Sequence, residues 1–180
     1  NFQHNKFCTG SELIALGEID FSEEMEISKT LDTSNKEDRK KLFNLVENID
    51  KDVSFVISTI IKANKIPIII GGGHNNAYGN IKGLALAKGI PVNAINFDAH
   101  TDFRIREGRH SGNGFTYAFE EGFLKKYFIF GLHENFVSKS VFNTLKTIEE
   151  RVKYVTYEEM AVRKSKSFST EITNDIKFIT

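Results

Sequence analysis

Short, uninterrupted apolar runs alternate along this chain with longer segments in which apolar residues recur every three or four positions. The first long segment follows Ser34-Asn35-Lys36-Glu37, which has the Ser-x-x-Glu spacing of a capping box. Between residues 42 and 61 its apolar side chains form one continuous stripe. We therefore predict a long amphipathic helix that begins at Ser34 and covers an apolar surface, expected to be a sheet.

Two of the short runs, residues 66–70 and 92–97, consist largely of β-branched or large apolar residues. Such runs are typical of strands buried on both faces. Pro67 and Pro91 stand where these strands would begin, a position that tolerates a missing amide donor. Further strands are predicted at residues 127–132, 153–156 and 177–180. Helices are predicted at residues 75–88, 114–122, 137–151 and 158–162.

The alternation of strands and helices with short connections predicts right-handed crossovers and a mainly parallel sheet with helices on both faces. We expect an α/β fold of three layers, α/β/α. No internal repeat, low-complexity tract or linker divides the chain, so residues 1–180 are interpreted as a single domain. Residues 1–33 are interpreted as an irregular lead-in.

Composition excludes several classes of function. The 24 basic residues balance the 24 acidic ones, and this argues against a general nucleic-acid binder, which needs a basic surplus. The single cysteine permits neither an intrachain disulfide nor a thiolate zinc site, so a reduced, cytoplasmic setting is expected. The longest apolar run is too short to cross a membrane. The expected partner is therefore a small molecule, with no nucleic acid and no membrane.

Two polar segments follow the first two predicted strands. One is Gly-Gly-Gly-His, ending at His74, and the other is Asp-x-His-x-Asp, starting at Asp98. Because ligands bind beyond the carboxyl ends of parallel strands, both segments are expected at one rim of the sheet. In an extended chain alternate side chains share a face, so Asp98, His100 and Asp102 are predicted to converge. Their oxygen and nitrogen ligands favour manganese over zinc, iron or magnesium, and His74 is expected to add a fourth ligand.

Each segment alone has a simpler interpretation. One alternative interpretation of the glycines at 71–73 is a phosphate-binding loop, although the segment lacks both the Lys-Ser/Thr of a P-loop and the dinucleotide-binding glycine spacing. A lone His74 is more often structural than a ligand, and Asp98 alone would suit a helix cap. The occurrence of both segments at one rim favours the metal site.

The segments at 71–74, 98–102 and 111–113 resemble motifs of the ureohydrolase family of arginase, agmatinase and formimidoylglutamase. The likeness covers most of residues 66–135. It implies that His74, Asp98 and Asp102 hold one manganese ion, and that His100 and a bridging Asp98 hold a second. A hydroxide shared by two Mn²⁺ ions would then attack the carbon of a linear amidine or guanidine and break a C–N bond. No further catalytic side chain is identified. The resemblance also implies a homo-oligomer.

The substrate is predicted from the residues after Asp102. Arg104 continues the alternate series, and its guanidinium suits a carboxylate, although a loop ion pair is the simpler interpretation. Ser111 and Asn113 correspond to the family's substrate-side loop. Arginase-like members have a histidine where this chain has Phe115, and His110 is out of register with it. The pattern is closer to formimidoylglutamase, which converts formiminoglutamate to glutamate and formamide, with arginase or agmatinase activity as the alternatives.

Glu134 follows the predicted strand at 127–132, at the same rim, and is a further candidate for substrate binding. With His133 it would line the pocket or support the ligands, unless both are turn residues. The family also has a later Asp-x-Asp metal motif, which does not occur after Asp102 in these residues. The domain is therefore expected to be incomplete. Two explanations stay open: a piece of a larger enzyme, or an inactive relative that serves as a binding or scaffold domain.

Overall fold

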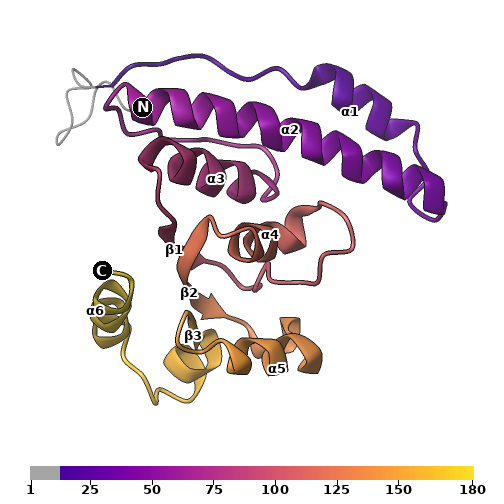
Figure 1. The fold of residues 1–180 in the computed structure, drawn as a ribbon. Coiled ribbons are helices and arrows are strands. Elements are labelled where there is room, and N and C mark those ends of the chain that lie inside the picture. Colours follow the sequence, from indigo (N-terminus) through magenta and orange to yellow (C-terminus); the bar gives the residue numbers. More distant parts are fainter. Residues whose placement is uncertain (1–12) are drawn as a thin grey trace.

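The structure is a computed structural model that describes residues 13–180, shown as a ribbon in Figure 1. Its described α-helices are α1 (Ser22–Lys29), α2 (Lys36–Lys62), α3 (Asn76–Lys88), α4 (Gly114–Glu120), α5 (Lys139–Thr147) and α6 (Phe168–Ile179). Its strands are β1 (Val92–Phe97), β2 (Leu124–Leu132) and β3 (Val152–Thr156). Three single turns complete it: η1 (Ser111–Asn113), η2 (Glu134–Phe136) and the π-helical η3 (Glu158–Val162).

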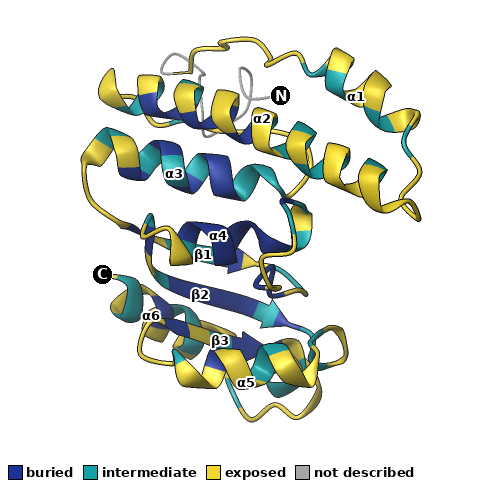
Figure 2. Cartoon of the chain, turned by 45° about the vertical axis from the view of Figure 1, so that its right-hand side comes forward, coloured by how far each residue is buried: buried dark blue, intermediate teal, exposed yellow. Residues whose placement is uncertain are grey.

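The three strands form a parallel sheet in the order β1-β2-β3. The central strand β2 is largely buried, as its dark colour in Figure 2 shows. On one face its side chains pack with residues of α3, α4 and α5. On the other face they pack with residues of η3 and α6. The predicted parallel sheet between two helical layers is therefore confirmed.

Helix α2 begins one residue later than the predicted capping box. Its N-cap is Asn35, whose side chain accepts hydrogen bonds from the amides of Glu37 and Asp38. Ser34 instead bonds to Asp32 in the preceding turn. The main neighbour of α2 is α3 and not the sheet, so the two helices lie side by side across the top of the molecule (Figure 2).

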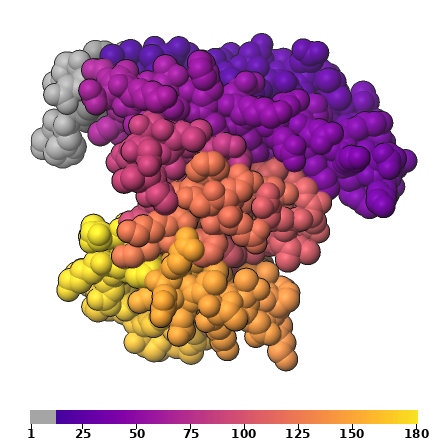
Figure 3. Space-filling view, viewed as in Figure 1, coloured from indigo at the N-terminus to yellow at the C-terminus, as the bar shows by residue number. Residues whose placement is uncertain are grey.

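Glycine allows this close approach of α2 and α3. A Cβ at Gly83 would lie 2.6 Å from the carbonyl oxygen of Ser54 and 2.8 Å from Cβ of Ile57. At Gly79 it would lie 2.8 Å from a methyl carbon of Val53. In the space-filling view the α1–α2 layer lies above the sheet and its flanking helices α5 and α6 (Figure 3).

Two predicted strands are wrong. Residues 66–70 form no strand, and Ile66 and Ile70 are 90% and 78% exposed. The run has β-branched composition, but a strand also needs a neighbour for its backbone, and in the described part of the chain β1 pairs only with β2. Residues 177–180 close helix α6, which starts at the N-cap Ser167 and turns Ile172 and Ile179 toward the sheet.

The remaining boundaries differ less. Helix α5 is shorter than the predicted 137–151, and β2 begins three residues before the predicted 127. The predicted helices at 75–88 and 114–122 are present as α3 and α4. Within the predicted irregular lead-in, α1 is helical, while residues 1–12 of that segment lie outside the described part. Between residues 13 and 180 no helix is long and apolar enough to span a membrane.

Candidate metal centre

The candidate centre lies where the carboxyl end of β1 meets the start of α3. Asp98 directly follows β1, and its amide donates to the carbonyl of Phe130 on β2, so its backbone continues the sheet. His74 lies in the turn that starts α3, where its carbonyl accepts from the amide of Ala77. The fold thus brings together two segments that are 24 positions apart in the sequence, at the rim where the sequence placed them.

The segment after Asp98 is bent and not extended. Bends at Ala99 and His100 interrupt the strand geometry, and Asp102 has a φ of 46°, in the left-handed region. The backbone at Thr101 is fixed to the sheet, because the hydroxyl of Tyr127 on β2 donates to the carbonyl of Thr101 at 2.9 Å. The convergence of Asp98 and Asp102 therefore arises from the bend, and the alternation used to predict it does not hold.

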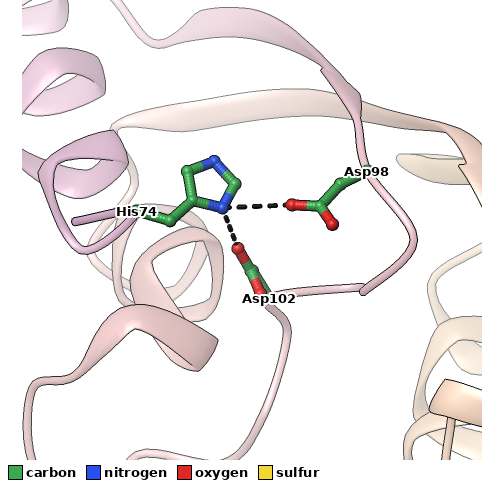
Figure 4. A group of neighbouring side chains, drawn as sticks. All are labelled: His74, Asp98 and Asp102. Carbon is green, nitrogen blue, oxygen red and sulfur yellow. Dashed lines mark ion pairs between the residues drawn. The ribbon is translucent and has the colours of Figure 1, made fainter. Parts of the chain in front are cut away.

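Three side chains meet at this point, as Figure 4 shows. Nδ1 of His74 lies 3.1 Å from Oδ2 of Asp98 and also pairs with Oδ2 of Asp102. One ligand atom from each residue lies within 4.8 Å of the others. The Asp102 side chain is 10% exposed and that of Asp98 21% exposed, so both carboxylates are largely shielded from solvent.

This donor set fits a hard or borderline divalent cation. Ligands at adjacent corners of an octahedron, each about 2.1 Å from the ion, are about 3 Å apart. The 3.1 Å between His74 and Asp98 is close to that spacing. Carboxylate and imidazole without thiolate are ligands that suit manganese. The three side chains therefore bring donor atoms that suit such an ion to within 4.8 Å of one another.

The electrostatics of the cluster also favour a cation. The pKa of His74 is raised, chiefly because Asp102 accepts a hydrogen bond from its ring, with a smaller contribution from the charge of Asp98. Partial burial of the ring opposes this shift. Two carboxylates thus draw a positive charge to the point between them, whether a proton on His74 or a metal ion.

His100 lies on the other side of Asp98. Its Nδ1 is 3.3 Å from Oδ1 of Asp98, whereas Oδ2 of the same carboxylate faces His74. The His100 ring is stacked on Phe136 at a centroid distance of 4.9 Å, and its side chain is 59% exposed. Asp98 therefore presents one oxygen to each imidazole, which is the arrangement that a carboxylate bridging two ions requires.

A cavity of about 350 Å³ opens beside these side chains. Six of the predicted site residues line it: His74, Asp98, His100, Asp102, Arg104 and Ser111. Arg104 is 61% exposed and pairs with Glu107 at 2.7 Å. Thr101 and Gly112, which belong to the predicted segments at 98–102 and 111–113, also line the cavity, as does Phe136, which the sequence analysis missed. For Phe136 the available signal was its position just after β2, at the same rim.

Two predicted substrate-binding residues lie away from the cavity wall. Asn113 is fully buried, and its amide bonds within the loop that it closes, with Arg109, the amide of His110 and the carbonyls of Ile105 and Gly108. Glu134 accepts hydrogen bonds from Arg163, which lowers its pKa. Neither residue is among those that line this cavity, so their role in substrate binding stays a prediction.

His133, considered with Glu134 in the sequence analysis, also does not line this cavity. Its ring stacks on Tyr157 at 4.7 Å and on Phe136 at 5.4 Å. It therefore supports the wall from behind, through Phe136.

Comparison with known proteins places this arrangement in a family. The family model described as Arginase family matches residues 6–178. The chain belongs to the arginase family. A formimidoylglutamase of Streptococcus pyogenes is 36% identical over 98 residues, which are 50% of this chain and 30% of that protein. The chain thus spans about a third of the length of the curated relatives that it matches.

Solved structures of family members share the fold. Formimidoylglutamase from Bacillus subtilis superposes with a TM-score of 0.63 at 22% identity, over 72% of this chain and 40% of that one. A Trypanosoma cruzi formiminoglutamase with Mn²⁺ superposes with a TM-score of 0.60 at 22% identity, over 74% of this chain and 45% of that one. These likenesses support the α/β/α architecture of the arginase family.

Proposed function

We propose that this chain carries part of the active site of a manganese-dependent hydrolase that cleaves a C–N bond of a linear amidine, with a formimidoylglutamase-like activity. The observation that carries the proposal is the convergence of His74, Asp98 and Asp102 at the end of β1, with His100 on the far side of Asp98. The relative named formimidoylglutamase and the structural neighbour named formiminoglutamase, which was solved with Mn²⁺, support it.

The four side chains divide between two ions in this proposal. His74, Asp98 and Asp102 would hold the first, and His100 together with Asp98 would hold the second. Bound manganese supplies the Lewis acidity that makes water a nucleophile near neutral pH. The chain itself orients the two carboxylates, because Asp98 is fixed by its backbone hydrogen bond to β2 and Asp102 by the bend that precedes it.

Arg104 and Ser111 on the cavity wall are proposed to bind the substrate. The Arg104 guanidinium and its partner Glu107 are both solvent-exposed, so their ion pair is weak in free energy and a substrate carboxylate can replace Glu107. A substrate with a carboxylate at one end and an amidine at the other therefore fits the wall. Formiminoglutamate, hydrolysed to glutamate and formamide, satisfies this description better than a cationic amine such as agmatine. A cytoplasmic location and a homo-oligomer remain predictions.

The test is a manganese titration of the full-length protein by calorimetry, followed by assays on formiminoglutamate, arginine and agmatine. We expect binding, with hydrolysis of formiminoglutamate preferred, and a stabilisation of about 2.7 kcal/mol at a hundredfold excess over Kd. Asp98→Ala is expected to abolish both manganese binding and hydrolysis, because it removes a ligand of each ion. Asp52→Ala, an exposed aspartate on α2, is the matched control and should change neither.

Turnover of arginine or agmatine in place of formiminoglutamate would reassign the substrate within the family. Two results would contradict the proposed activity. One is the absence of manganese binding at high Mn²⁺ concentration, and the other is manganese binding without hydrolysis of any of the three substrates. The first result would favour a domain that keeps the fold for binding or scaffolding alone.

A further inference from the structure

One buried guanidinium connects the two halves of the candidate metal centre. Arg109 is 1% exposed, and it pairs with Asp50 of α2 through two bonds: Nε to Oδ2 at 2.7 Å and NH2 to Oδ1 at 3.2 Å. The same NH2 donates to the carbonyl of Asn75 at 3.0 Å. Asn75 directly follows His74, so this bond holds the turn from which His74 extends.

The other side of the guanidinium holds the loop that follows Asp102. NH1 of Arg109 donates to the carbonyl of His110 at 3.0 Å and to Oδ1 of Asn113 at 2.7 Å. The rings of Tyr78 and Tyr117 lie 4.8 and 5.1 Å from the guanidinium carbon. Arg109 is thus buried, with hydrogen-bond partners at Nε, NH1 and NH2, and these bonds fix its orientation.

We propose that Arg109 and Asp50 are positioning residues of the metal centre. Neither touches the cavity, but together they hold the backbone beside His74 at a set distance from the loop that carries Asp102 and Arg104. Partners behind metal ligands commonly change metal affinity tenfold to a hundredfold when they are removed. This inference rests on the proposed manganese site.

A purely stabilising role makes a different prediction. Replacing a buried ion pair by apolar residues of similar volume is often neutral for stability, whereas removing one partner leaves an uncompensated charge. The double variant Asp50→Leu/Arg109→Met therefore separates the two roles. It keeps an apolar side chain against Tyr78 and Tyr117 and loses the bond to the carbonyl of Asn75.

The experiment measures Mn²⁺ binding to the full-length protein by calorimetry, with circular dichroism and thermal unfolding of the metal-free forms. We expect the double variant to be folded and to bind Mn²⁺ about tenfold to a hundredfold more weakly than the wild type. The matched control is Arg151→Met. Arg151 also bonds to backbone carbonyls, those of Leu124 and Lys125, and covers Phe119, but it lies away from the cavity. Its removal should leave the affinity unchanged.

Arg109→Lys is the second variant, in case the double variant does not fold. A lysine keeps the charge opposite Asp50 but lacks the planar fork that reaches Asn75 and Asn113 at once, so a weakened affinity is again expected. A folded double variant, or a lysine variant, that binds Mn²⁺ as tightly as the wild type would overturn the inference alone. A wild-type protein that binds no manganese would overturn the proposed function and this inference with it.

Discussion

Asp102 has a backbone conformation that residues other than glycine seldom adopt. Such strain, on the order of 1 kcal/mol or more, persists where the surrounding structure over-determines it, and it clusters at functional sites. Here the turn aims the carboxylate at His74. The sequence predicted that Asp98 and Asp102 would meet, but no residue pattern reveals a bend at Ala99 and His100. The role of Arg109 was not predicted for a similar reason, because its partners Asp50 and Asn75 lie in segments that only the fold brings to it.

A second unusual residue is Asp175 of α6, which is 2% exposed. Among the described residues neither of its carboxylate oxygens has a hydrogen-bond partner. Burial, with a contribution from the charge of Glu171, raises its pKa to about 7. The folded state therefore retains a proton that the unfolded chain releases above about pH 4. It follows that Asp175 does not destabilise the folded state at low pH. The destabilisation grows as the pH rises from about 4 toward 7 and reaches its full value above pH 7.

We predict that Asp175→Asn raises the free energy of unfolding by about 1 kcal/mol at pH 8 and leaves it nearly unchanged at pH 4. The reason is that an amide carries no charge to bury. Urea unfolding of both proteins at the two pH values measures the difference. Asp52→Asn, at an exposed position of α2, is the control and should show no pH-dependent gain. Equal stability of Asp175→Asn and the wild type at pH 8 would contradict the assigned pKa.

At the scale of elements, the contact between α2 and α3 depends on glycine. Gly83→Ala adds a methyl group that would lie 2.6 Å from the carbonyl oxygen of Ser54, on a rigid helix backbone. Overpacking costs about 1–3 kcal/mol, and the better helix propensity of alanine returns up to about 1 kcal/mol. We predict that Gly83→Ala lowers the free energy of unfolding by about 1–2 kcal/mol, measured by urea unfolding. Leu86→Ala, on the exposed face of α3, should have a smaller effect.

The elements that the sequence predicted correctly are those whose own residues contain the whole pattern that specifies them. The stripe in α2 and the capping glycine after α3, Gly89 with a φ of 68°, belong to the helices themselves and need no partner. The two failures, residues 66–70 and 177–180, are short apolar runs. Periodicity cannot separate a strand from a helix over so few residues, and whether a strand forms depends on the neighbour available to it.

For the molecule as a whole, the alternation of runs and stripes was sufficient to predict a parallel sheet between helical layers. It was not sufficient to predict which surfaces would be covered. Helix α2 packs on α3 and forms an outer layer, while the apolar run at 66–70 lies exposed. Tertiary packing decides this distribution, and a local pattern carries no information about it.

The run at 66–70 exposes several apolar side chains in succession, since Ile66, Ile68 and Ile70 are 90%, 67% and 78% exposed. Consecutive exposed β-branched residues without charge favour association between molecules. We therefore predict that Ile68→Ser/Ile70→Ser lowers the self-association of this chain, measured by sedimentation velocity over a range of concentrations. Phe55→Ser provides the control, since Phe55 is 72% exposed but stands alone on the outer face of α2. If association is equally reduced in the control, overall surface hydrophobicity and not the run at 66–70 drives it.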